Sequence, residues 1–284
     1  LLLTAAIVAW LLVHQNSVQL HKVVSSLQLV DSGREENCDE EAVSSSQSAF
    51  ERASSFIYDK LKAENVRGRI GQTRKKFDLQ NWTDVTGGGL TNPDRELLAR
   101  IYGNASSLFE WGIGESTYIA GYFNIPRYAG IDSDLNWVGL VRDKCPSHFR
   151  FYFGDVGKTK RWGFPKDISL DKIHWDYQMV PLLAEPENFD VYMVDGRMRL
   201  SCALAALLHS SSRIGVDVDP IVLIHDYPNC SGCRKERSNY HRFEEVADLI
   251  EHSGSNLGVF KRKKNVTDEE IMKIWMDVSN STSM

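Results

Sequence analysis

One segment, Leu108–Thr117, limits the fold of this chain more than any other. Its apolar residues end in an acid, and two glycines one residue apart and a Ser-Thr pair follow. This order predicts a buried strand that breaks into a tight turn and opens a helix. Gly112 and Gly114 lack a Cβ atom, so a ligand can approach the backbone, and the helix start offers free N–H groups. The segment therefore predicts a site for a nucleotide-like ligand.

Further apolar runs along the chain also end in an acid or a histidine, and helical patterns separate them. Strands that alternate with helices predict a parallel sheet whose ligand crevice lies at the carboxyl ends of the strands. We therefore expect an α/β fold: a Rossmann-like, doubly wound and mostly parallel sheet with helices on both faces. A helix over 240–252 and a strand over 257–261 are expected to follow. The strand-end residues are Asp132, Asp155, Asp195 and the pair His225-Asp226.

Three acids in the first half of this pattern suggest which ligand binds. Asp132 lies about 20 residues beyond the glycine turn, where an acid accepts both ribose hydroxyls of a nucleotide, or else caps the next helix. Glu110 precedes the first glycine and suits a cationic amino group better than a pyrophosphate, which favours S-adenosylmethionine over NAD. Asp155 is expected to accept a hydrogen bond from the adenine amino group, although Gly-Asp is also a common turn.

The later strand ends predict the reactive part of the site. A neutral histidine such as His225 takes a proton from a hydroxyl, and an adjacent acid such as Asp226 orients the ring or binds a divalent cation. Asp195 is a candidate base or metal ligand, so Asp195 and Asp226 are the expected ligands if a metal takes part. Arg197 is expected to hold an acidic substrate, whereas Arg199 is expected to pair with surface carboxylates.

Several of these segments resemble class I S-adenosylmethionine-dependent methyltransferases, over roughly Asn92 to Lys263. The turn Glu110–Thr117 is similar to their first motif, with Ser116 where many members have a third glycine. Ile131–Trp137 resembles the strand-two acid segment of a subset that carries the sequence Val-Asp-Gly-Arg, seen here from Val194. The resemblance implies that Glu110, Gly112, Gly114, Ser116, Asp132 and Asp155 bind the cofactor, and that Asp195, Arg197, His225 and Asp226 face the acceptor.

The expected activity is O-methylation of a glycan or a small molecule. Trp175 and Tyr177 lie between the third and fourth strands, where their rings would line the acceptor or belong to the core. Two alternatives remain at this stage. A glycosyltransferase would use Asp132-Ser-Asp134 as its metal and nucleotide-sugar motif, and a non-catalytic protein of the same fold would act as a partner module.

The N-terminal part suggests a membrane-anchored domain. Residues 1–14 are almost wholly apolar and predict a signal anchor, too short as given for the span of about 20 residues that a bilayer requires. Residues 15–90 predict a stem with a helix near 49–63, residues 91–266 the methyltransferase-like domain, and residues 267–284 a C-terminal helix and tail. Five Asn-x-Ser/Thr motifs favour a glycoprotein with its domain in the lumen of the Golgi or endoplasmic reticulum. The net charge of −5 argues against a nucleic-acid partner.

Overall fold

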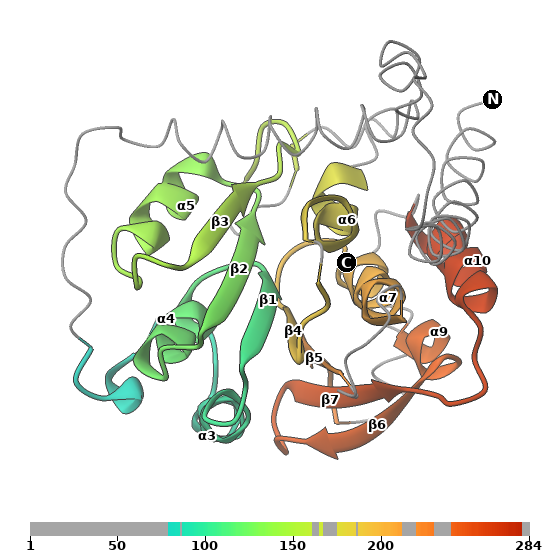
Figure 1. The fold of residues 1–284 in the computed structure, drawn as a ribbon, viewed down its shortest axis with the longest axis horizontal. Helices are drawn as coiled ribbons and strands as arrows, with labels where there is room; N and C mark the ends of the chain where they lie inside the picture. Colours follow the sequence, from blue (N-terminus) through green and yellow to red (C-terminus); the bar gives the residue numbers. More distant parts are fainter. Residues whose placement is uncertain are drawn as a thin grey trace, which may run out of the picture. The chain divides into compact units, whose positions relative to one another are not determined.

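A seven-stranded sheet forms the centre of the fold in the computed structural model of this chain (Figure 1). Its strand order is β3-β2-β1-β4-β5-β7-β6. The first five strands run parallel, and β7 is antiparallel to both β5 and β6. The strands are β1 (Ser107–Trp111), β2 (Arg127–Asp132), β3 (Arg150–Phe153), β4 (Val191–Val194), β5 (Ile221–His225), β6 (Ala247–His252) and β7 (Leu257–Arg262).

The described residues all lie in one compact unit of the chain, Tyr58–Met284. They are residues 79–85, 87–160, 165–166, 175–185, 187–211, 220–229 and 240–279. The predicted anchor over 1–14, the stem helix near 49–63 and most of the stem lie outside them. Within the described ranges, no helix is both long enough and apolar enough to cross a bilayer.

Helices cover both faces of the sheet, as Figure 1 shows. On one face, α3, α4 and α5 pack over a buried cluster that includes Leu108 of β1 and Tyr128 of β2. On the other face, α6 and α10 pack against α7, which lies on β4 and β5. The helices are α3 (Asn92–Tyr102), α4 (Glu115–Tyr122), α5 (Leu135–Arg142), α6 (Trp175–Ala184), α7 (Arg199–Ser211), α9 (Tyr240–Glu244) and α10 (Asp268–Ser279), with a short 3-10 helix η2 (Trp82–Asp84) before them.

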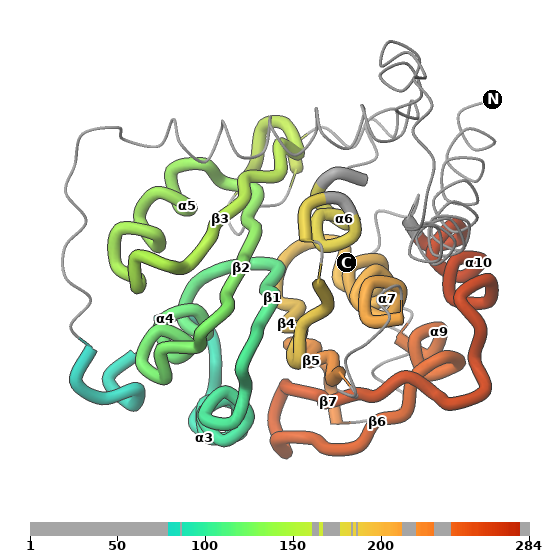
Figure 2. The backbone as a smooth tube through the Cα atoms, viewed as in Figure 1, coloured from blue at the N-terminus to red at the C-terminus, as the bar shows by residue number. Residues whose placement is uncertain are grey.

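The predicted strand, turn and helix around the two glycines are present. Every residue of β1 is buried because the strand lies between β2 and β4, and α4 begins at Glu115. Figure 2 shows β1 beside β4, although two strands and three helices separate them along the chain. The strand order therefore reverses between β1 and β4, and open α/β sheets bind ligands at such a reversal.

Backbone hydrogen bonds align the strand ends at this reversal. The Gly112 N–H donates to the Ile131 carbonyl of β2 at 2.8 Å, and the Asp195 N–H donates to the Trp111 carbonyl at 2.8 Å. The loops that follow β2, β1 and β4 thus lie next to one another. The residues at these three strand ends form one continuous edge.

One sequence-based expectation about the elements differs from the structure. The predicted helix over 240–252 is wrong beyond Glu244, because β6 forms an antiparallel hairpin with β7, and strand pairing overrides local helical propensity. The first core helix, α3, has Thr91 as its N-cap, in a capping box with Asp94. The predicted C-terminal helix is present as α10, which packs on α7.

Candidate functional site

The two glycines of the first turn have different surroundings. Gly112 has a φ of +82°, and a Cβ atom there would lie 2.4 Å from the nitrogen of Gly196 in the loop after β4. A Cβ atom on Gly114 would meet only the ring of Trp137, at 3.8 Å. Gly112 therefore allows two loops to pack together, whereas Gly114 faces open space that Trp137 bounds.

Glu110 braces this turn from inside the protein. Its side chain is fully buried, because strand alternation places it on the same face of β1 as Leu108. It accepts hydrogen bonds from the hydroxyls of Ser116, Thr117 and Tyr128. Burial raises the pKa of Glu110 to about 7. Glu110 and Ser116 were expected to touch the cofactor, and in the structure both side chains instead point beneath the turn.

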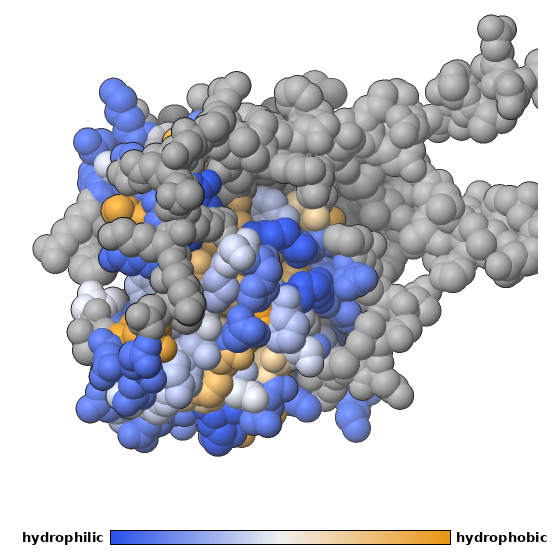
Figure 3. Space-filling model, turned by 60° about the vertical axis from the view of Figure 1, so that its left-hand side comes forward, coloured by the Kyte–Doolittle hydropathy of each residue, from blue (hydrophilic) through white to orange (hydrophobic). Residues whose placement is uncertain are grey.

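Asp132 and Trp137 flank the open side of the turn. Asp132 ends β2, its Oδ1 accepts the Asp134 N–H at 3.0 Å, and burial raises its pKa to about 6. Trp137 is 41% exposed, and its indole N–H donates to the Ile113 carbonyl at 2.6 Å. This bond fixes an aromatic surface on α5 beside Gly114. Figure 3 shows hydrophobic residues scattered among hydrophilic ones on the face drawn there.

Two other acids near β2 and β3 have local partners. The Asp134 carboxylate accepts the Asn136 and Trp137 N–H groups and so caps α5. Asp155 is exposed, and its Oδ1 accepts the Gly157 N–H at 2.9 Å within a turn. The loop that carries Asp155 is bonded to the end of β2 through the Gly154 N–H and the Asp132 carbonyl, at 3.0 Å. Asp155 thus lies near Asp132 along the edge, with one of its carboxylate oxygens engaged locally.

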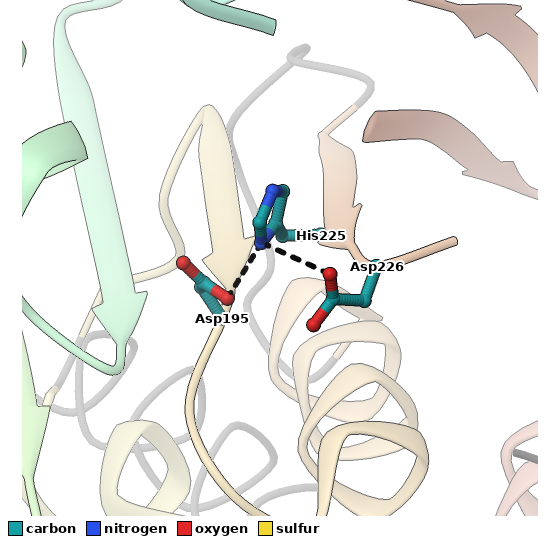
Figure 4. Close-up of side chains that lie close together, drawn as sticks. All are labelled: Asp195, His225 and Asp226. Carbon is teal, nitrogen blue, oxygen red and sulfur yellow. Dashed lines mark hydrogen bonds and ion pairs between the residues drawn. The ribbon is translucent and has the colours of Figure 1, made fainter. Parts of the chain in front are cut away.

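The structure brings together the three residues that the sequence predicts for the reactive end, as Figure 4 shows. Nδ1 of His225 lies 2.9 Å from Oδ1 of Asp195 and 3.8 Å from Oδ1 of Asp226. Asp226 has a φ of +56°, which is strained for a residue other than glycine and turns its side chain outward. The exposed fraction is 61% for the Asp226 side chain but 6% for that of His225. Asp226 is therefore the accessible member, and His225 lies behind it.

Charges fix the protonation of this cluster. Burial by itself would raise the pKa of Asp195, but His225 and Arg199 outweigh it and hold that pKa below its usual value. Burial by itself would lower the pKa of His225, but Asp195 and then Asp226 raise it above 6.5. Since an ionised carboxylate only accepts hydrogen bonds, Nδ1 of His225 carries a proton and donates a hydrogen bond to Asp195.

Arg199 joins the two loops of the cluster, a role that the sequence-based expectation of surface pairing missed. Its side chain is only 10% exposed. The guanidinium reaches Oδ1 of Asp195 at 3.0 Å and Oδ2 of Asp226 at 2.6 Å. It also donates to the carbonyls of Gly196 and His225, at 3.1 and 2.6 Å. Arg199 is the first residue of α7, directly after the β4 loop, and its spacing of four residues from Asp195 was the available signal.

Asp94 is a second residue that sequence analysis missed. It is fully buried in the first turn of α3, and its Oδ2 lies 3.9 Å from Nε2 of His225. It accepts hydrogen bonds from the Ser253 hydroxyl and the Asn256 N–H in the turn between β6 and β7. Burial by itself would raise the pKa of Asp94, but these bonds and those from Thr91 outweigh it, so that pKa lies below its usual value. Nothing in the sequence beyond a helix-capping acid pointed to this position.

The residues expected to line the acceptor have other positions or are not described. Tyr177 is 1% exposed, and its hydroxyl accepts the Arg197 N–H at 3.3 Å, so it supports the β4 loop from within the core. Trp175 begins α6, but its side chain is outside the described part of the chain. The Arg197 side chain is half-buried beside the cluster.

No protein-family model and no curated protein matches this chain. Among solved structures, that of a methyltransferase-like protein from Silicibacter pomeroyi DSS-3 is similar, with a TM-score of 0.53 and 22% sequence identity. The match covers 69% of this chain and 97% of that protein. At this identity the likeness concerns the fold alone, and the chain has a methyltransferase-like fold.

Proposed function

We propose that this chain binds S-adenosylmethionine at the carboxyl edge of its sheet and transfers the methyl group to an oxygen atom of an acceptor. The observation that carries the proposal is the reversal of strand order between β1 and β4. It places the open glycine Gly114 between Asp132 on one side and the cluster of Asp195, His225 and Asp226 on the other. Cofactor and acceptor would thus meet above the ends of β1 and β4.

The residues beside Gly114 fit this cofactor. A Cβ atom at Gly114 would occupy space that no atom fills within 3.8 Å, so the backbone is open to a ligand there. The exposed indole of Trp137 offers an apolar surface for an adenine ring. The Asp132 carboxylate, which accepts the Asp134 N–H, would also accept ribose hydroxyls. Asp155 would lie beside the adenine amino group.

The cofactor would supply an electrophilic methyl group, and the residues of the chain would orient the acceptor. Asp226, exposed at the edge, would receive the acceptor hydroxyl, with the half-buried Arg197 next to it. The Asp195 carboxylate, held by His225 and Arg199, would accept the hydroxyl proton as the new oxygen–carbon bond forms. His225 acts through Asp195, because its Nδ1 donates to that carboxylate and its Nε2 points toward buried Asp94.

The proposal also includes the kind of acceptor and the cellular location of the protein. A glycan or small-molecule hydroxyl suits an exposed acid such as Asp226, and an anchor formed by residues 1–14 would hold the domain at a secretory membrane. The described asparagines of the glycosylation motifs are all exposed, as that setting requires. They are Asn81, Asn104, Asn229 and Asn265.

The glycosyltransferase alternative has less support. It needs both carboxylates of Asp132-Ser-Asp134 free to bind a metal and a nucleotide sugar. The Asp134 carboxylate instead caps α5 through two backbone N–H groups, and Asp132 accepts the Asp134 N–H. Manganese-dependent binding of a nucleotide sugar would favour this alternative over methyl transfer.

Calorimetry on the full chain tests the proposal. S-adenosylmethionine and S-adenosylhomocysteine are each titrated into wild type, Gly114→Val and Gly139→Val. Gly139 is the matched control, because it lies two residues beyond Trp137 and a Cβ atom there meets nothing within 4 Å. We expect binding to wild type and Gly139→Val and its loss in Gly114→Val. Absence of heat with both ligands in wild type would refute the proposal.

A further inference from the structure

The cluster at the ends of β4 and β5 has the composition of a metal site. Single ligand atoms of Asp195, His225 and Asp226 all lie within 4.8 Å of one another. A divalent ion requires carboxylate lone pairs that are free and an imidazole nitrogen without a proton. Whether this cluster meets those two requirements depends on the groups that already contact these atoms.

Arg199 already forms ion pairs with both carboxylates of the cluster. Its guanidinium contacts Oδ1 of Asp195 at 3.0 Å and Oδ2 of Asp226 at 2.6 Å, from a position that is 10% exposed. Oδ1 of Asp195 also accepts a hydrogen bond from the Nδ1–H group of His225 at 2.9 Å. The guanidinium remains charged, because Asp195 raises its pKa despite the burial that would lower it. A divalent ion among the same oxygens would therefore meet a fixed positive charge.

His225 offers no lone pair toward the acids. Its Nδ1 carries a proton, since the atom that it contacts is an oxygen of an ionised carboxylate. Its Nε2 is buried and has no hydrogen-bond partner in the described part of the chain. That nitrogen is 3.9 Å from Oδ2 of Asp94, on α3. Of the three potential ligands, only the second oxygen of each carboxylate is left for a metal.

We propose that Arg199 is the fixed cation of the Asp195–His225–Asp226 cluster, and that this site takes no divalent metal because the guanidinium holds the place of one. The guanidinium already pairs with both carboxylates, so a divalent ion would add further positive charge next to it. Arg199 also bonds to the carbonyls of Gly196 and His225, which sets the distance between the two loops. Arg199 is in this sense a positioning residue for the acids that would face the acceptor.

Manganese binding to the full chain tests this inference without any methyl donor. The loss of the free Mn²⁺ signal in electron paramagnetic resonance is measured for wild type, Arg199→Met and Arg199→Lys. Methionine keeps most of the unbranched apolar stem of the side chain without its charge, whereas lysine keeps the charge. We expect no binding to wild type or Arg199→Lys. In Arg199→Met we expect affinity for Mn²⁺ to rise at least about tenfold, and Asp195→Asn in that background to remove the gain.

Two results would overturn the inference. One is Mn²⁺ binding by wild type that Asp226→Asn abolishes, a comparison that needs no Arg199 variant and uses an acid with a 61% exposed side chain. The other is a folded Arg199→Met variant that binds no more Mn²⁺ than wild type, because the guanidinium would then not be what excludes the ion. Neither result depends on binding of S-adenosylmethionine, so a failure here is separate from a failure of the proposed function.

Discussion

The backbone of Gly112 packs directly against that of Gly196. A Cβ atom on Gly112 would lie 2.4 Å from the Gly196 nitrogen, and one on Gly196 would lie 3.0 Å from the Gly112 nitrogen. The first glycine of the turn is thus required by contact between two loops of the protein, whereas Gly114 borders the proposed ligand space. A motif that looks uniform in sequence combines a packing position with a binding position.

Gly112→Ala tests the packing position. We expect it to lower the free energy of unfolding by at least about 2 kcal/mol, because the methyl group overlaps backbone atoms and the φ of +82° disfavours any side chain. Gly114→Ala is the control, since its methyl group would contact only Trp137 at 3.8 Å. Urea denaturation of both variants measures the difference. Equal stability of the two variants would contradict the assigned roles.

The core elements of the fold follow from local sequence patterns. The apolar run before Glu110 predicted β1, and the glycine turn predicted the helix α4, which begins at Glu115. The last part of the sheet was harder to predict from the sequence. Strand β6 has exposed residues at four successive positions and no alternation of buried and exposed residues. Its strand conformation comes from pairing with β7, which local patterns do not contain.

The site was predictable only in part for the same reason. Strand-end acids such as Asp195 could be found, because parallel strands bring their carboxyl ends to one edge. Side-chain direction could not be predicted. Glu110 was expected to contact the cofactor and is fully buried, and Tyr177, for which an acceptor contact and a core position were both open, is in the core. Asp94 of α3 and Arg199 of α7 contact the residues at the strand ends. These contacts depend on tertiary packing, which local sequence patterns do not contain.

Asp132→Asn tests the proposed ribose contact. We expect affinity for S-adenosylhomocysteine to fall about tenfold to a hundredfold, which corresponds to loss of a hydrogen bond to a charged acceptor. Burial raises the pKa of Asp132 to about 6, so wild-type affinity should also fall as the pH drops below that value. Calorimetry at several pH values measures both effects. An equal pH dependence in Asp132→Asn would assign the titration to another group.

Glu115→Gln tests the contact between the start of α4 and the loop that contains Gly88 and Leu90. The Glu115 carboxylate is 3% exposed, pairs with Arg95, and accepts the Gly88 and Leu90 N–H groups at 2.8 and 3.3 Å. We expect the substitution to cost about 1.5–3 kcal/mol of unfolding free energy. The control is Glu251→Gln, since that exposed pair with Arg100 should contribute only about 0–1 kcal/mol. If chemical denaturation shows similar losses of unfolding free energy for both variants, the buried contacts of Glu115 do not stabilise the fold as proposed.

His225→Gln tests the charge on His225. Because the folded pKa of His225 lies above 6.5, the stability from its charge is fully present below the unfolded value and is lost as the pH rises through the folded one. We expect a loss of about 1.5–3 kcal/mol near about pH 6 and a smaller loss near about pH 9. Denaturation at both pH values measures it. In an Asp195→Asn background the difference should shrink, since the ionised partner is gone, and a loss independent of pH in both backgrounds would place a neutral histidine at this position.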